Sequence, residues 1–273
     1  MARFFATVFS TAVVATALVA LAQPARAEMC QNPDNLTFVS GNGHCLAIKT
    51  YPPANGPAKV LAVVLHGDLS SGGVADEVFF MAEEAAKAGA VGVAMMRPGY
   101  TGDGRRSTGI ATRDQDRDDR YRAADMDSIT VAVRSLKANH GVDRVVMIGF
   151  SGGAVISGVM LGRAAPLVSG AVLLSCPCNV PEWREYNNWG PLYNAESPHA
   201  YIDRIPKGTP VIALTGENDG NTHKRFAIAY VEKANAAGAK ARFVEVPGAN
   251  HGLRRIKEQP QLTDAIREVI QGN

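Results

Sequence analysis

Most of this chain has no excess of positive or negative charge. The sequence has 28 Lys and Arg against 26 Asp and Glu, and its first 27 residues hold Arg3 and Arg26 with no acidic residue. Subtraction leaves 28 − 2 = 26 basic against 26 acidic residues, so the rest of the chain is neutral. Proteins that bind nucleic acids by neutralising phosphates need a basic surface. We therefore expect no nucleic-acid partner.

Long hydrophobic runs are missing after the first residues. One apolar stretch covers residues 4–22, after Arg3 and before the A-R-A pattern of residues 25–27. This order is typical of a bacterial signal peptide with an A-x-A cleavage site. We expect residues 1–27 to be removed, a mature chain that begins at Glu28, and a periplasmic or secreted protein with no stable membrane span. The alternative is an uncleaved anchor, because the run approaches spanning length.

Cysteine is scarce, with four in the chain: Cys30, Cys45, Cys176 and Cys178. An exported protein meets an oxidising compartment, where disulfides form, and four cysteines allow three pairings. We expect Cys30–Cys45, which would hold the new N-terminus, and Cys176–Cys178. Because a bridge across one residue is strained, the second pair has two alternatives, namely free thiols or a redox-active pair.

Motifs for metals and nucleotides are also absent. The chain has no H-E-x-x-H zinc pattern and no G-x-x-x-x-G-K-[ST] phosphate loop. These patterns hold a catalytic zinc ion and a nucleotide phosphate, respectively. We expect neither a cofactor nor a metal.

The chain does show a regular alternation of apolar runs and helical patterns. Runs rich in Val, Ile and Leu predict buried strands over residues 59–65, 90–96, 144–148, 168–174, 210–215 and 241–246. Helical patterns cover residues 75–88, 126–136, 152–164, 222–237 and 258–270. This alternation predicts an α/β fold with a mostly parallel sheet and helices on both faces, in one domain over residues 28–273. Residues 36–40 and 45–51 suit antiparallel edge strands.

The pentapeptide Gly149-Phe-Ser151-Gly-Gly153 lies between a predicted strand and a predicted helix. This is G-x-S-x-G in the context of a nucleophile elbow, a sharp turn that exposes the Ser hydroxyl above the sheet. Side chains at the two outer glycines would clash across such a turn. The helix N-terminus also favours negative charge beside the hydroxyl. Ser151 is therefore the predicted nucleophile.

A Ser hydroxyl needs a base to become a good nucleophile. Among the six His residues, His251 lies in a loop between the last predicted strand and the last predicted helix. Asp219 follows the preceding strand, and the order Ser151, Asp219, His251 is that of an α/β-hydrolase triad. Glu217 is the competing acid, but it lies closer to the strand end, where we expect a structural role.

Acyl transfer also requires N–H donors for the oxyanion. The amide of Gly152, directly after the nucleophile, is one candidate. The loop after residues 59–65 should supply the other, and we expect the backbone N–H of Asp68, with Leu69 as the alternative. The carboxylate of Asp68 should then point away, because a negative charge beside the oxyanion opposes catalysis. We expect His66 to brace this loop by hydrogen bonds.

Four segments carry a family resemblance: VVLHGD (residues 63–68), GFSGG (149–153), SPHAYIDRIPKGTPVIALTGENDG (197–220) and GANHG (248–252). Together they resemble the α/β-hydrolase superfamily, and more narrowly its dienelactone-hydrolase and prolyl-oligopeptidase-like branch. The resemblance covers nearly all of the chain after residue 27 and implies a serine hydrolase of esters or amides. Ser151 departs from typical dienelactone hydrolases, whose nucleophile is Cys.

Aromatic residues make up 7% of the chain, yet five lie between residues 183 and 201, including both Trp residues. In the resembled fold this connection crosses the mouth of the site. One interpretation is a short lid that lines an apolar pocket, and the other is packing of an irregular loop. We expect substrate contacts from Trp183, Trp189 and Tyr193, and from Tyr100 after an earlier strand.

Three functions remain open at this point. The first is an exported carboxylesterase that acts on a small-molecule ester through an acyl-enzyme. The second is a peptidase or amidase that uses the same triad. The third is a binding or redox protein on a hydrolase scaffold. The presence of a nucleophile, an acid and a base argues against this function, because a binding protein does not need all three.

Overall fold

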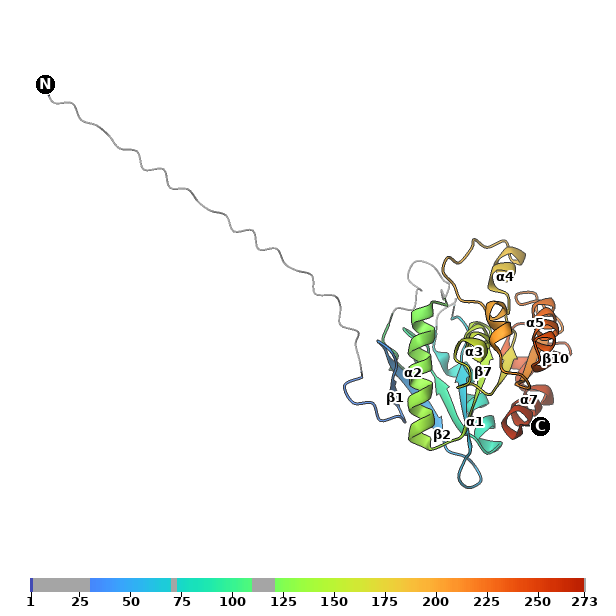
Figure 1. Cartoon of the computed structure of the whole chain (residues 1–273), viewed down its shortest axis with the longest axis horizontal. Helices are drawn as coiled ribbons and strands as arrows, with labels where there is room; N and C mark the ends of the chain where they lie inside the picture. The colour runs from blue at the N-terminus through green and yellow to red at the C-terminus, as the bar shows by residue number, and fades with distance from the viewer. Residues whose placement is uncertain (2–29, 70–72, 110–120, 273) are drawn as a thin grey trace.

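The computed structural model describes Met1 and residues 30–69, 73–109 and 121–272. Residues 2–27 of the predicted signal peptide and the expected new N-terminus at Glu28 lie outside this part of the chain. The described residues form a central eight-stranded sheet in the order β1-β2-β4-β3-β7-β8-β9-β10 (Figure 1).

The sheet is mostly parallel, as the sequence predicts. All neighbouring pairs from β4 to β10 are parallel, whereas β1–β2 and β2–β4 are antiparallel. The strands are β1 (Phe38–Ser40), β2 (Cys45–Tyr51), β3 (Val60–Leu65), β4 (Val91–Met95), β7 (Arg144–Phe150), β8 (Gly170–Leu174), β9 (Pro210–Gly216) and β10 (Lys240–Val246). A separate hairpin pairs β5 (Thr101–Gly102) with β6 (Arg105–Arg106).

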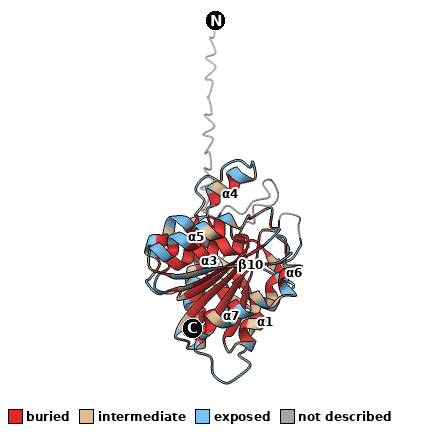
Figure 2. Cartoon of the chain, turned by 90° about the vertical axis from the view of Figure 1, so that its right-hand side faces the viewer, coloured by how far each residue is buried: buried red, intermediate tan, exposed pale blue. Residues whose placement is uncertain are grey.

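Helices cover both faces of the sheet (Figure 2). One face packs against α2 (Ala123–His140), α3 (Gly152–Arg163) and α5 (Arg225–Ala236). The other packs against α1 (Phe79–Lys87), α6 (Leu253–Lys257) and α7 (Pro260–Gln271). Three further elements are η1 (Ala75–Val78), α4 (Val180–Tyr186) and η2 (Pro198–Arg204).

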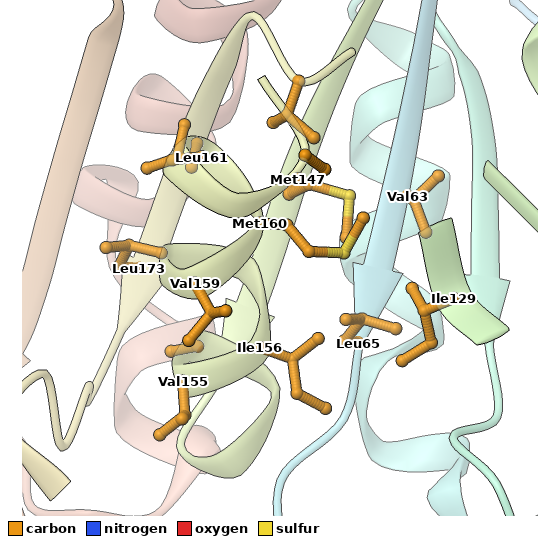
Figure 3. Packing of buried hydrophobic residues seen from close by; sticks show 14 of the residues in the cluster. Val63, Leu65, Ile129, Met147, Val155, Ile156, Val159, Met160, Leu161 and Leu173 are labelled. Atoms are coloured by element: carbon orange, nitrogen blue, oxygen red, sulfur yellow. The ribbon is translucent and has the colours of Figure 1, made fainter. Parts of the chain in front are cut away.

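The core divides into two layers because successive side chains of a strand point to opposite faces. In β3, Leu61, Val63 and Leu65 face the α2–α3 side, whereas Val60, Ala62 and Val64 face the α1–α7 side. Figure 3 shows Val63 and Leu65 beside the side chains of α3. A central strand buried on both faces therefore appears in the sequence as a continuous apolar run.

Both expected disulfides are present. Cys30 pairs with Cys45 at the start of β2, and Cys176 pairs with Cys178 directly after β8. The second bridge is fully buried. It lies where the chain leaves the sheet and turns into α4.

The parallel strands bring distant parts of the sequence to one edge of the sheet. Ser151 follows β7, Asp219 follows β9, and His251 lies in the loop after β10. Asp68 follows β3, on the other side of β7. Open α/β sheets bind their ligands at this carboxyl edge, so the topology gathers the predicted site residues there.

Candidate active site

Ser151 lies in a strained turn between β7 and α3. Its backbone has φ 49° and ψ −116°. Residues other than glycine rarely adopt this conformation, which persists only when the surrounding structure holds it. A side chain at Gly149 would overlap the carbonyl of Gly153, and one at Gly153 would overlap the carbonyl of Leu65. The two glycines of the motif are therefore required by close approach of the backbone, as a nucleophile elbow demands.

Three predicted residues form one chain of hydrogen-bond contacts. The Nε2 atom of His251 lies 3.2 Å from the Oγ of Ser151, and its Nδ1 atom lies 3.0 Å from the Oδ2 of Asp219. The carboxylate is completely buried, while the imidazole side chain is 27% exposed. The ring also packs 5.4 Å, between centroids, from Phe150. This geometry is that of a nucleophile, a base and the acid that orients the base.

The environment of Asp219 keeps its carboxyl group ionised. Burial alone would raise the pKa of Asp219, but hydrogen bonds from His251 and Thr222, with the positive charge of His251 when protonated, lower it below its ordinary value. The backbone N–H groups of Asn221 and Thr222 also donate to Oδ1. An ionised carboxylate accepts hydrogen bonds only, so it fixes the proton of the imidazole on Nδ1.

The competing acid, Glu217, has another role. Its Oε2 atom accepts a 2.7 Å hydrogen bond from the backbone N–H of Gly248. This contact joins the loop after β9 to the loop that carries His251. The structural role expected for Glu217 agrees with this position.

The loop after β3 lies directly against the nucleophile. A side chain at Gly67 would come within 3.2 Å of the Cβ of Ser151. The buried His66 accepts a hydrogen bond at Nε2 from the backbone N–H of Arg97, so its proton lies on Nδ1 and is donated to the carbonyl of Gly67. Burial, with the nearby charge of Arg97, holds the pKa of His66 well below its usual value. His66 is thus a neutral imidazole that braces the loop after β3.

The carboxylate of Asp68 does not point away, contrary to the expectation from the sequence. It occupies the space that a side chain at Gly152 would need. Its Oδ1 accepts from the guanidinium of Arg97 at 2.7 Å, and its Oδ2 accepts from the hydroxyl of Tyr121 at 2.6 Å. Because the Arg97 side chain is fully buried, the pair is poorly screened by water, and the cation offsets the charge that would oppose an oxyanion.

Sequence analysis did not single out Arg97 or Tyr121. Arg97 follows β4 by two residues, and a cation directly after a buried strand is the one signal that marks it. Its partner Asp68 is 29 positions away, in the loop after the neighbouring strand β3. Pattern alone does not reveal such a pairing.

The aromatic segment contains both buried and exposed rings. Trp183, on α4, is 5% exposed and donates its indole N–H to the backbone and side-chain oxygens of Asn221. It therefore attaches α4 to the loop that carries the acid. Trp189 and Tyr193 are 42% and 77% exposed. Tyr100 is nearly buried and packs edge-on against His66. Substrate contact by these side chains stays a prediction.

Two further searches cover only the described residues. Within them, no cluster of His, Cys, Asp and Glu is suited to hold a metal ion. No helix in the same part of the chain combines the length and apolar character that crossing a bilayer requires.

Solved structures with the same fold include several hydrolases. Est1E from Butyrivibrio proteoclasticus, solved with ferulic acid bound, aligns with a TM-score of 0.65 and 16% identity over 86% of this chain and 97% of that one. An esterase from the archaeon Pyrobaculum calidifontis aligns with a TM-score of 0.62 and 18% identity, over 86% of this chain and 80% of the esterase. The acylaminoacyl peptidase of Pyrococcus horikoshii aligns with a TM-score of 0.60 and 15% identity, over 86% of this chain and 41% of the peptidase. These likenesses establish an α/β-hydrolase fold.

Comparison with curated protein sequences gives no match. The model of the prolyl oligopeptidase family, Peptidase_S9, matches residues 84–269. This region exceeds half of the chain and contains Ser151, Asp219 and His251. By this match, the chain belongs to the prolyl oligopeptidase family of serine hydrolases.

Proposed function

We propose that this protein is an exported serine hydrolase that cleaves carboxylic esters through an acyl-enzyme. The observation that carries the proposal is the continuous contact from Ser151 through His251 to the buried Asp219. The support for an ester substrate comes from the fold relatives. Est1E, whose structure holds ferulic acid, is matched over 97% of its length.

The geometry supports a two-stage reaction. The Oγ of Ser151 attacks the ester carbonyl carbon while Nε2 of His251 takes its proton, and the carbonyl π electrons move to the oxygen. The resulting oxyanion accepts hydrogen bonds from the backbone N–H groups of Gly152 and Asp68. Collapse expels the alcohol, which receives the proton from His251. Water then attacks the acyl-enzyme by the same steps and releases the acid and Ser151.

The peptidase or amidase is the second candidate, because a peptidase shares the fold and the family is named for oligopeptidases. Two substrates separate the candidates: a p-nitrophenyl ester of a short acid and an aminoacyl p-nitroanilide. We expect a kcat/KM for the ester at least a hundredfold above that for the anilide. The opposite order would assign the protein to the peptidases.

Export is the second part of the proposal. Residues 1–27 have the pattern of a cleaved leader, and two disulfides suit an oxidising compartment. Intact mass of the protein recovered from the periplasm tests both. We expect the loss of residues 1–27 and of four hydrogens. Four thiols that titrate freely in the unfolded, unreduced protein would contradict the disulfides, and an unprocessed N-terminus would contradict cleavage.

A further inference from the structure

Thr222 contacts two members of the triad at once. It lies three residues after Asp219, between β9 and α5, and is fully buried. Its backbone N–H donates to Oδ1 of Asp219 at 2.8 Å, and its Oγ1 lies 2.8 Å from Oδ2 of the same carboxylate. The same hydroxyl oxygen lies 3.2 Å from Nδ1 of His251. One side chain therefore closes a triangle with the acid and the base.

Hydrogen-bond chemistry fixes the direction of each contact. A hydroxyl has one proton to donate, and an ionised carboxylate can only accept. Thr222 therefore donates to Asp219, and its oxygen lone pair faces the N–H at Nδ1 of His251. That N–H now has acceptors at 3.0 and 3.2 Å on the carboxylate and at 3.2 Å on the hydroxyl. The proton is held on Nδ1, which leaves the Nε2 lone pair toward Ser151.

The two carboxylate oxygens are held differently. Oδ1 accepts from the backbone N–H groups of Asn221 and Thr222, which no side-chain replacement removes. Among the described residues, Oδ2 is contacted by two side chains, those of His251 and Thr222. Without the Thr hydroxyl, Oδ2 keeps, of these two contacts, the one with His251, while Oδ1 stays anchored by the backbone. The carboxylate can then tilt more easily, and the imidazole would move with it. We propose that Thr222 is a positioning residue that sets the orientation and tautomer of His251. This inference rests on the proposed function.

Isosteric replacement separates this role from packing. Thr222→Val keeps the shape and the backbone N–H but removes the hydroxyl, and Thr222→Ser keeps the hydroxyl. Thr215→Val is the matched control, because Thr215 is also fully buried in β9 and its hydroxyl has no hydrogen-bond partner within the described residues. With a p-nitrophenyl ester, we expect Thr222→Val to lower kcat about tenfold with KM within about twofold, by analogy with the loss of partners that orient a His ligand in metal sites. Thr222→Ser and Thr215→Val should stay within about threefold of the parent.

A measurement that needs no turnover makes the test independent of the proposed function. The proton on Nδ1 of His251 gives a strongly downfield NMR signal when it is held in a hydrogen bond. We expect this signal to move or disappear in Thr222→Val and to persist in Thr222→Ser and Thr215→Val. A parent protein that hydrolyses no ester would refute the proposed function, while the signal would still decide the role of Thr222. An unchanged kcat and an unchanged signal in Thr222→Val would overturn the inference.

Discussion

Trp183 and Trp189 lie close together, with ring centroids 5.1 Å apart and planes at 89°, but the structure predicts opposite consequences for their removal. Trp183 is 5% exposed and bonds Asn221 in the acid loop, whereas Trp189 is 42% exposed. Replacement of each by Ala should therefore separate packing from substrate binding. We expect Trp183→Ala to act on stability and Trp189→Ala to act on KM.

The magnitudes follow from burial. Removing a buried Trp costs about 3–5 kcal/mol, and for a domain of this size each kcal/mol lowers the Tm by about 2–4 °C. Trp183→Ala should therefore lower the Tm by about 6–20 °C. Trp189→Ala loses the edge-on ring contact, worth about 0.5–1.5 kcal/mol, and the contact of the Arg184 guanidinium with its ring, worth about 0.5–1 kcal/mol. Its Tm should therefore fall by about 2–10 °C.

The assay is a series of p-nitrophenyl esters with graded acyl length, measured beside thermal unfolding of both variants. If the exposed ring meets the substrate, Trp189→Ala should raise KM about five- to tenfold, since a lost aromatic contact costs about 1 kcal/mol or more. The preferred chain length should also shift. A Trp189→Ala variant with a Tm loss equal to that of Trp183→Ala and an unchanged ester profile would refute this reasoning and remove the segment from the site.

Three further predictions concern the loops around the nucleophile. Arg97→Met should destabilise the protein by up to about 3–5 kcal/mol and lower kcat, because it removes the buried guanidinium that pairs with the Asp68 carboxylate. The kcat and Tm of the Arg97→Met/Asp68→Asn double variant should recover in part, and no recovery would contradict the pairing. Gly153→Ala should fail to fold or lose its activity, because the new Cβ overlaps the carbonyl of Leu65; wild-type circular dichroism and kcat would count against this close approach. Burial holds the pKa of His66 well below the usual value of about 6.5 for a His side chain. Below about pH 6.5 the unfolded state therefore binds a proton that the folded state does not, and the free energy of unfolding should fall by up to about 1.4 kcal/mol per pH unit. Denaturant unfolding across pH should show a smaller slope in His66→Gln, and equal slopes would be the contrary result.

The sheet and the contacts among Ser151, His251 and Asp219 were predictable because both depend on local sequence pattern and on strand order. Strands buried on both faces are continuous apolar runs, as in β3. A G-x-S-x-G motif between a strand and a helix indicates a nucleophile elbow. The chain order of Ser151, Asp219 and His251 then follows from parallel strands that end at the same edge. The predicted disulfide pairs agree with the structure.

The parts that escaped prediction depend on contacts between distant positions. The short helix α4 begins with a Pro at its first turn and covers seven residues, too few for a periodic pattern. The neutralisation of Asp68 by Arg97 needs the relative placement of two loops. The contact of Thr222 with the triad depends on the turn after Asp219, which directs its hydroxyl inward instead of toward solvent.

The central claim is that Ser151 is a nucleophile activated by His251. Labelling with a fluorophosphonate, followed by peptide mass spectrometry, tests it most directly, with Ser151→Ala as the control variant. We expect one phosphonylated peptide, carrying the adduct on Ser151, no label on folded Ser151→Ala, and a kcat for ester hydrolysis that falls by about 10⁴- to 10⁶-fold in that variant. Labelling at another residue, or retained hydrolysis by Ser151→Ala, would contradict the account.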